Sequence, residues 1–154
     1  MSFDRHADAI EAPHHPMPIR LPRHYRPSDE EEFMNPRQRE YFRQKLIQWR
    51  ADLLQGSTET LHHLQAGGLQ EADAADRATL EAGTAIELRT RDRERKLIAK
   101  IDEALRRIED GTYGYCEETN EPIGLRRLEA RPTATLSIEA QERHEQHERT
   151  HRDD

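Results

Sequence analysis

The sequence is poor in apolar residues and contains a single cysteine. Hydrophobic residues make up 33% of its 154 residues and charged residues 36%, whereas a globular domain usually has about half apolar residues. This composition excludes a thick single core and favours an elongated helical structure that spreads its burial along the molecule. Cys116 has no second cysteine, which excludes an internal disulfide and, by itself, a multi-cysteine zinc site.

Long apolar runs are also missing. Charges at Asp4, Arg5 and Asp8 interrupt the N-terminus, so neither a signal peptide nor a membrane span is predicted, and we expect a cytoplasmic protein. The formal charge of −7 argues against bare duplex DNA or RNA as the main ligand, because such proteins need a basic face. A protein partner is therefore expected. The sequence contains no glycine-rich phosphate loop, GxSxG elbow or HExxH helix, so we do not expect an enzyme.

Local signals predict a long helix after a proline-rich arm over residues 1–32. Asn35 is a good N-cap, and Pro36 suits the first helical position, where a missing N–H costs nothing. An apolar stripe then continues toward Gly67 and Gly68, which can end a helix. The spacings are four, three and four residues for Phe42, Leu46, Trp49 and Leu53, and Leu61 and Leu64 extend the stripe.

A second long helix is predicted from near Asp76 to Asp110. Two long helices joined by a short turn indicate an antiparallel coiled-coil hairpin over residues 33–110, with its tip near 67–78. A turn centred near residue 70 would place Phe42 opposite Ile98 and Trp49 opposite Arg91. We therefore predict that Arg91 stacks on Trp49.

Residues 111–154 differ in composition from the helical segments, because glycines and prolines separate short apolar segments. They predict a small globular base and a C-terminal helix capped by Ser137. The predicted fold class is thus mainly α, a long coiled-coil hairpin on a small base. The candidate core of the base comprises Tyr113, Tyr115, Ile123, Leu125, Leu128 and Leu136.

Three charged or histidine-rich clusters are candidate sites, and each has a structural alternative. Carboxylates at Glu71, Asp73 and Asp76 could carry negative charge into a cationic or metal-containing cavity, or could stabilise a helix N-terminus. The basic run over residues 89–96 could bind an anion or form a solvated helix face. In the anion reading, Arg93, Leu97 and Lys100 share a stripe that Arg131 could approach. A stripe of His144, His147 and His151, with Cys116, could hold a metal or belong to a polar helix.

Four segments resemble the DksA/TraR family of RNA polymerase-binding transcription factors: FMNPRQREYFRQKLIQWR, DAADRA, LRTRDRERKLIAKIDEALRRIEDGTYGYC and IGLRRLEARPTA. The resemblance covers roughly residues 33–140. It implies that the hairpin enters the secondary channel of RNA polymerase and that its tip acts near the catalytic centre. Asp73, Asp76 and Ala78 match the functional tip positions, of which the second Asp is the most critical.

The resemblance also implies an effector. Family members act with the alarmone ppGpp in the stringent response, repressing ribosomal RNA promoters and activating amino-acid biosynthesis promoters. The nucleotide lies between polymerase and the factor, and Arg93, Leu97, Lys100 and Arg131 match positions that serve it. Gln141 stands where that pattern has a lysine, so the response is expected to be weaker by one charge-assisted contact.

The base departs from the zinc-containing members, in which four cysteines hold a metal. The matching positions here are Cys116, Thr119, Ser137 and Ala140. A hydroxyl or methyl group does not replace a thiolate, so we predict a base without zinc, held by packing alone, with no tightly bound cofactor. The chain then looks like the zinc-independent paralogue type, active in strong chelator and able to replace a zinc-containing member when zinc is scarce.

Two other functions remain open at this point. One is a transcript-cleavage factor that binds the same channel, and the other is a structural coiled-coil adaptor. In all three cases we expect a monomer that binds neither a specific DNA sequence nor a membrane.

Overall fold

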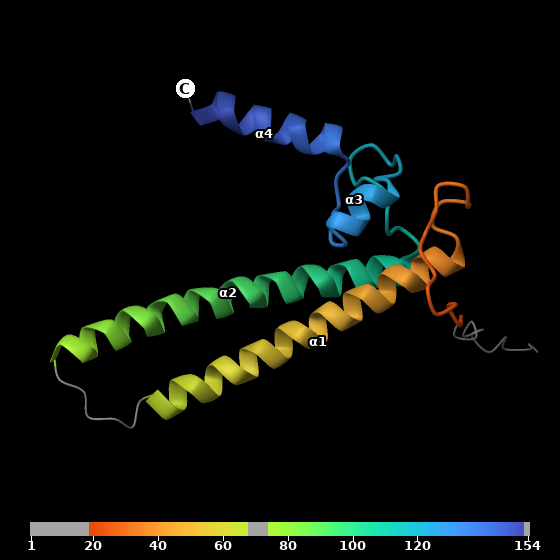
Figure 1. The fold of residues 1–154 in the computed structure, drawn as a ribbon. Coiled ribbons are helices and arrows are strands. Elements are labelled where there is room, and N and C mark those ends of the chain that lie inside the picture. The colour runs from red at the N-terminus through yellow and green to blue at the C-terminus, as the bar shows by residue number, and fades with distance from the viewer. Residues whose placement is uncertain (1–18, 68–73, 153–154) are drawn as a thin grey trace, which may run out of the picture.

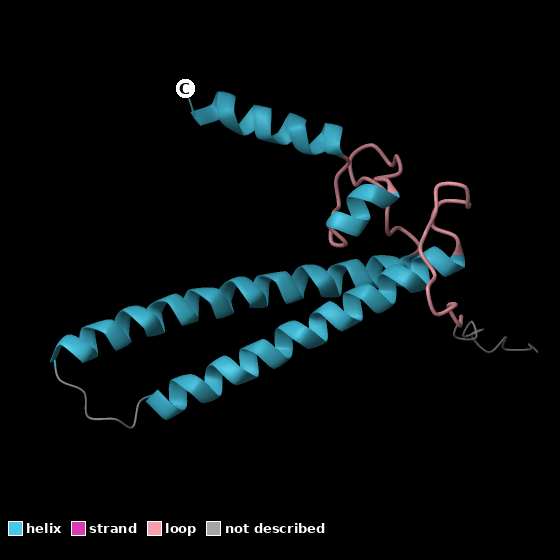
Figure 2. Ribbon diagram, viewed as in Figure 1, coloured by secondary structure: helices cyan, strands magenta, loops and turns pink. Residues whose placement is uncertain are grey.

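The computed structural model describes residues 19–67 and 74–152. Within these ranges four helices follow one another: α1 (Pro36–Gly67), α2 (Ala74–Asp110), α3 (Leu125–Ala130) and α4 (Ile138–Arg152). Helices α1 and α2 lie side by side and antiparallel, α3 lies at the root of this hairpin, and α4 projects away from it (Figure 1). Figure 2 shows helices and loops without strands over the described ranges. The predicted fold class is confirmed, whereas the division into three domains stays a prediction.

Helix α1 begins where the capping signal predicted. The backbone N–H of Gln38 donates to Asn35 Oδ1 at 3.0 Å, which satisfies one of the free amides of the first turn. The Gln38 side chain, fully buried, accepts from the backbone N–H of Met34 at 2.8 Å. The cap therefore also holds the chain that enters the helix.

The described part of the proline-rich arm packs on the hairpin root. The Tyr25 ring meets the Tyr41 ring edge-on at 6.2 Å, and Phe33 meets Tyr115 edge-on at 5.5 Å. The Tyr25 hydroxyl donates to Glu31 Oε2 at 2.5 Å. Burial, the hydrogen bond and the charge of Glu31 raise the pKa of Tyr25 to about 12. Residues 1–18 of the predicted arm lie outside the described residues.

The register of the hairpin differs from the predicted one. Arg50 Nε lies 2.8 Å from Asp102 Oδ1, and the Ser57 hydroxyl donates to Glu94 at 2.8 Å, so facing residue numbers add up to about 152 rather than 140. Trp49 consequently faces the region of residue 103, and the predicted stacking of Arg91 on Trp49 is wrong. Among the described residues the cation–π contact is instead Lys45 over the Tyr41 ring, 5.9 Å from its centroid.

This register leaves the start of α2 beyond the end of α1. The residue that faces the last residue of α1 is about 85, so roughly 11 residues of α2, about 16 Å, extend past α1. Figure 1 shows this overhang clearly. The predicted register was wrong because it assumed that both helices pair up to a turn centred near residue 70, whereas the start of α2 has no facing residue on α1.

The core sits at the root of the hairpin, where both helices meet the base. Phe42, Leu46, Ile101 and Leu128 are fully buried. The predicted base core is confirmed: Tyr113, Ile123, Leu125 and Leu128 are buried, and Tyr115 and Leu136 pack against them. Toward the tip the apolar side chains are exposed, as at Leu80 and Ile86. The limited supply of apolar residues is therefore concentrated at the root.

Gly114 offers a test of this packing. Its φ is +89°, and an added Cβ would lie 2.9 Å from Cγ of the buried Met34. Gly114→Ala should lower the free energy of unfolding by about 1–3 kcal/mol more than Gly111→Ala, because overpacking is added to backbone strain. Gly111 is the matched control, with φ +79° and no atom within 4 Å of its would-be Cβ. Urea unfolding measures both variants, and equal losses would show that Met34 moves aside freely.

None of the described helices is long and apolar enough to cross a membrane.

Candidate functional site

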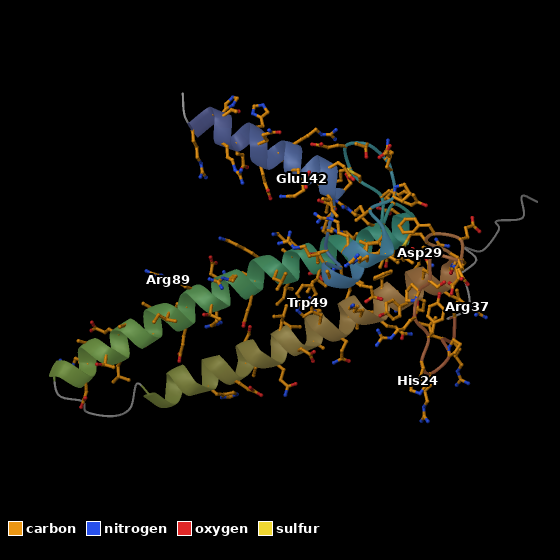
Figure 3. All side chains as sticks on the ribbon, turned by 45° about the horizontal axis from the view of Figure 1, so that its top comes forward. His24, Asp29, Arg37, Trp49, Arg89 and Glu142 are labelled. Atoms are coloured by element: carbon orange, nitrogen blue, oxygen red, sulfur yellow. The ribbon has the colours of Figure 1, made fainter. Side chains whose placement is uncertain are left out.

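A cavity of about 550 Å³ lies between the hairpin and the base. The hairpin contributes Trp49, Leu97 and Lys100 to its lining, and the base contributes Arg131 and Gln141. Trp49 lies between α1 and α2 in Figure 3. Three of the four residues predicted to bind the nucleotide, Leu97, Lys100 and Arg131, therefore meet in one cavity, together with Gln141.

The cations of this cavity differ in whether they are already paired. Arg107 forms an ion pair with Glu117 and lies 3.8 Å from Glu103, and Arg127 Nε donates to the carbonyl of Leu136 at 2.9 Å. Lys100 and Arg131 are exposed and have no carboxylate partner within residues 19–67 and 74–152. These two side chains are thus the cations that an incoming anion can engage without breaking an existing pair.

Arg93 lies outside this cavity. It is seven residues from Lys100 along α2, about 10 Å, and lines a separate shallow hollow with Leu88, Arg89, Asp92 and Lys96. The structure therefore brings together three of the predicted residues and leaves the fourth two turns nearer the tip.

The wall of the cavity that carries Arg131 is tied to the base by hydrogen bonds. The buried Tyr113 hydroxyl donates to the carbonyl of Pro132 at 2.7 Å, and burial raises the pKa of this hydroxyl. The backbone N–H of Arg131 donates to the carbonyl of Arg127 at 2.7 Å and ends α3. Motif spacing did not indicate Trp49 as part of the lining, because its place there depends on the hairpin register.

The tip residues are described only in part. Asp76 lies in the first turn of α2, and both it and Ala78 are exposed on the overhang. Asp73 lies outside the described residues. The overhang therefore presents Asp76 to solvent about 13 Å beyond the last residue of α1.

The four positions that match zinc ligands lie in the base. Cys116 is buried, and burial raises the pKa of its thiol. Hydrogen bonds from the Thr119 hydroxyl and from the backbone N–H groups of Ser137, Thr119 and Glu118 lower it again, to about 6. The Ser137 hydroxyl accepts from the backbone N–H of Ala140 at 3.2 Å, which confirms the predicted cap of α4.

The histidine stripe of α4 stays apart from Cys116. His144 contacts Glu118, and the rings of His147 and His151 lie 4.3 Å apart. Within the described residues no group of three or more His, Cys, Asp or Glu side chains could hold a metal ion. The structure does not assemble the metal stripe that the spacing left open.

Comparisons with known proteins match both parts of the chain. Residues 38–108 match the family model "DnaK suppressor protein DksA, N-terminal domain", and residues 111–146 match "Prokaryotic dksA/traR C4-type zinc finger". The chain is 68% identical over 130 residues to an RNA polymerase-binding transcription factor DksA of Caulobacter vibrioides, covering 84% of this chain and 92% of that protein. It is 46% identical over 115 residues to that of Escherichia coli K12, covering 75% and 76%.

A solved structure agrees with these matches. The transcription factor DksA2 of Pseudomonas aeruginosa superposes with a TM-score of 0.72 at 45% identity, covering 76% of this chain and 90% of that one. The likeness therefore extends from the sequence to the hairpin and its base.

The match to a C4-type zinc finger family overturns the prediction of a zinc-free chain, because it points to zinc binding in the base. The prediction counted ligands, whereas the family model matches the module as a whole, over residues 111–146. The side chains at the four matched positions do not form a four-cysteine site, since only Cys116 offers a thiolate.

Both halves of the sequence match in order, and a relative with 68% identity is covered over 92% of its length; the chain belongs to the DksA/TraR family.

Proposed function

We propose that this protein is a cytoplasmic transcription regulator that binds RNA polymerase directly and has no catalytic activity of its own. Its curated relatives are named RNA polymerase-binding transcription factors. The hairpin would enter the secondary channel of the polymerase, with the overhang of α2 leading. The observation that supports this most is the overhang itself, a single helix that places Asp76 and Ala78 beyond the coiled coil.

The proposed effector is ppGpp, bound between the polymerase and the cavity at the hairpin root. Its phosphate groups need cations, and Lys100 and Arg131 are the cations of that cavity that have no carboxylate partner in the described part of the chain. A volume of about 550 Å³ suits a small molecule. Leu97 would contact its apolar part, and Arg93 would act as a flanking cation nearer the tip. The response would repress ribosomal RNA promoters and activate amino-acid biosynthesis promoters.

Two measurements with purified RNA polymerase test this proposal. Binding of the labelled protein to core polymerase should saturate at one copy per enzyme. Transcription from a ribosomal promoter should then fall further as ppGpp is titrated in. Failure to bind polymerase would reject the whole proposal, whereas binding with no change at any ppGpp concentration would reject the effector alone.

The exposed carboxylate of Asp76 is also compatible with a second function, which is transcript cleavage within the same channel. There the carboxylate would support a metal ion held by the polymerase. Backtracked complexes distinguish the two: cleavage of their transcripts on addition of the protein favours this second function, and unchanged transcripts favour the regulator.

Replacing Gln141 by lysine is predicted to strengthen the response to ppGpp. Gln141 lines the cavity in a half-buried position where a cation would add one charge-assisted contact. Gln141→Lys should lower the ppGpp concentration for a half-maximal effect by roughly tenfold. Glu142→Gln, on the exposed side of α4, changes the net charge by the same one unit and is the control for net charge. An equal gain in both variants would attribute the effect to overall charge rather than to the cavity.

A further inference from the structure

Glu129 on α3 joins the base to α1 through three polar contacts. Its Oε2 lies 2.6 Å from Lys45 Nζ, and its carbonyl accepts from the same ammonium at 3.1 Å. The Tyr41 hydroxyl also donates to Oε2, at 3.1 Å. Lys45 and Glu129 are each about one third exposed, so water screens the pair only in part.

These contacts lie directly beside the cavity. Ala130 and Arg131 follow Glu129 in sequence and both line the cavity, and Arg131 is the C-cap residue directly after α3. Helix α3 has only six residues, so a shift of its last turn carries Arg131 with it. The hydrogen bonds of Tyr113 and Arg127 hold this wall to the base itself. Glu129, in contrast, holds it to α1, which packs along α2 and therefore along Lys100.

We propose that Glu129, held by Lys45 and Tyr41, is a positioning residue that sets Arg131 from the base opposite Lys100 from the hairpin. The inference rests on the proposed function of the cavity as an anion site. It adds that the affinity for the anion depends on the contact of Glu129 with Lys45 and Tyr41, although none of these three side chains needs to touch the anion. The site is assembled from two parts of the chain, and this contact joins α3 to the hairpin.

The first test uses the full-length protein in the transcription assay. Glu129→Ala should raise the ppGpp concentration for a half-maximal effect by about tenfold, the loss expected when one charge-assisted contact is misaligned. The effect without ppGpp and the affinity for polymerase should stay within about twofold of wild type. Glu129→Gln keeps an oxygen that accepts from Tyr41 and Lys45, so it should retain most of the response.

Asp102→Asn is the matched control. Asp102 pairs with Arg50 at 2.8 Å and joins α1 to α2, with a similar exposed fraction, but it is not one of the residues that line the cavity. It should leave the ppGpp response unchanged. An unchanged response in Glu129→Ala, or an equal loss with and without ppGpp, would overturn the proposal in favour of no role or a general structural role. Lys45→Met serves as the second variant if Glu129→Ala does not fold.

A second test needs neither polymerase nor ppGpp. Trp49 is the only tryptophan of the chain and lines the cavity, so its fluorescence reports on it. Iodide is attracted by converging cations, whereas acrylamide is neutral, so their quenching ratio measures how well Lys100 and Arg131 are assembled. Glu129→Ala should lower this ratio toward that of Arg131→Ala. An unaltered ratio would overturn the positioning role even where the proposed function holds. A lowered ratio in a protein without a ppGpp response would leave the positioning role standing and reject the effector.

Discussion

Asp76→Asn is expected to abolish the effect of this protein at promoters while leaving its affinity for RNA polymerase within about twofold of wild type. Asn has nearly the same shape as Asp and can still accept hydrogen bonds at a helix start, so the substitution chiefly removes a charge. Asp76 is exposed in the first turn of α2. Loss of its favourable interaction with the helix dipole should cost no more than about 1 kcal/mol of stability.

The lifetime of open complexes at a ribosomal promoter measures this effect, and polymerase binding is measured on the same preparation. Glu81→Gln is the control, since Glu81 is an exposed carboxylate on the same overhang of α2. It should act like the wild-type protein. If Asp76→Asn also shortened the lifetime as wild type does, the carboxylate would serve only the helix start, and the adaptor function would become the better account of the chain.

The different effects expected for Asp76→Asn and Glu81→Gln depend on the overhang, at whose end only Asp76 lies. In a hairpin paired to its ends, the tip would be a turn supported by both helices. Here the first stretch of α2 extends past α1 with little apolar burial, as the exposure of Leu80 shows. Such a segment is narrow and carries its charge at the end. A narrow tip suits entry into a confined channel better than it suits lateral contact with another surface.

Local features of the sequence predicted local structure well. Asn35 and Pro36 marked the start of α1 because capping depends only on neighbouring residues, and Ser137 did the same for α4. The core of the base also followed from spacing, with Leu128 fully buried. These predictions need no knowledge of how distant segments pair.

The hairpin register could not be predicted in the same way. The register is set by contacts between residues far apart in sequence, such as Arg50 with Asp102. The prediction assumed a turn centred near residue 70, so it gave each residue of α1 the wrong partner on α2. The error explains why Trp49 was assigned to Arg91 instead of to the cavity. Leu97 and Lys100 could be placed together because they lie one turn apart on one helix. Charge and spacing gave the approach of Arg131 only as one of two open interpretations, and the family resemblance favoured it.

The double substitution Lys100→Ala with Arg131→Ala is expected to remove the response to ppGpp. Each side chain would form a charge-assisted hydrogen bond to phosphate, worth about 1.5–3 kcal/mol, so losing both should raise the half-maximal concentration by at least about a hundredfold. Neither cation is engaged in an ion pair within the described chain, and both are exposed, so stability should change by less than about 1 kcal/mol.

The control must remove positive charge from α2 without touching the cavity. Lys96 meets this condition: it pairs with Asp92 at 3.3 Å and is largely exposed. Lys96→Ala should leave the ppGpp response within about twofold, and Arg93→Ala should fall between the control and the double variant because Arg93 only flanks the site. The effect without ppGpp should survive in all of them, since it depends on Asp76. A response that falls equally in Lys96→Ala and in the double variant would mean that net charge, rather than the meeting of Lys100 and Arg131, attracts the nucleotide.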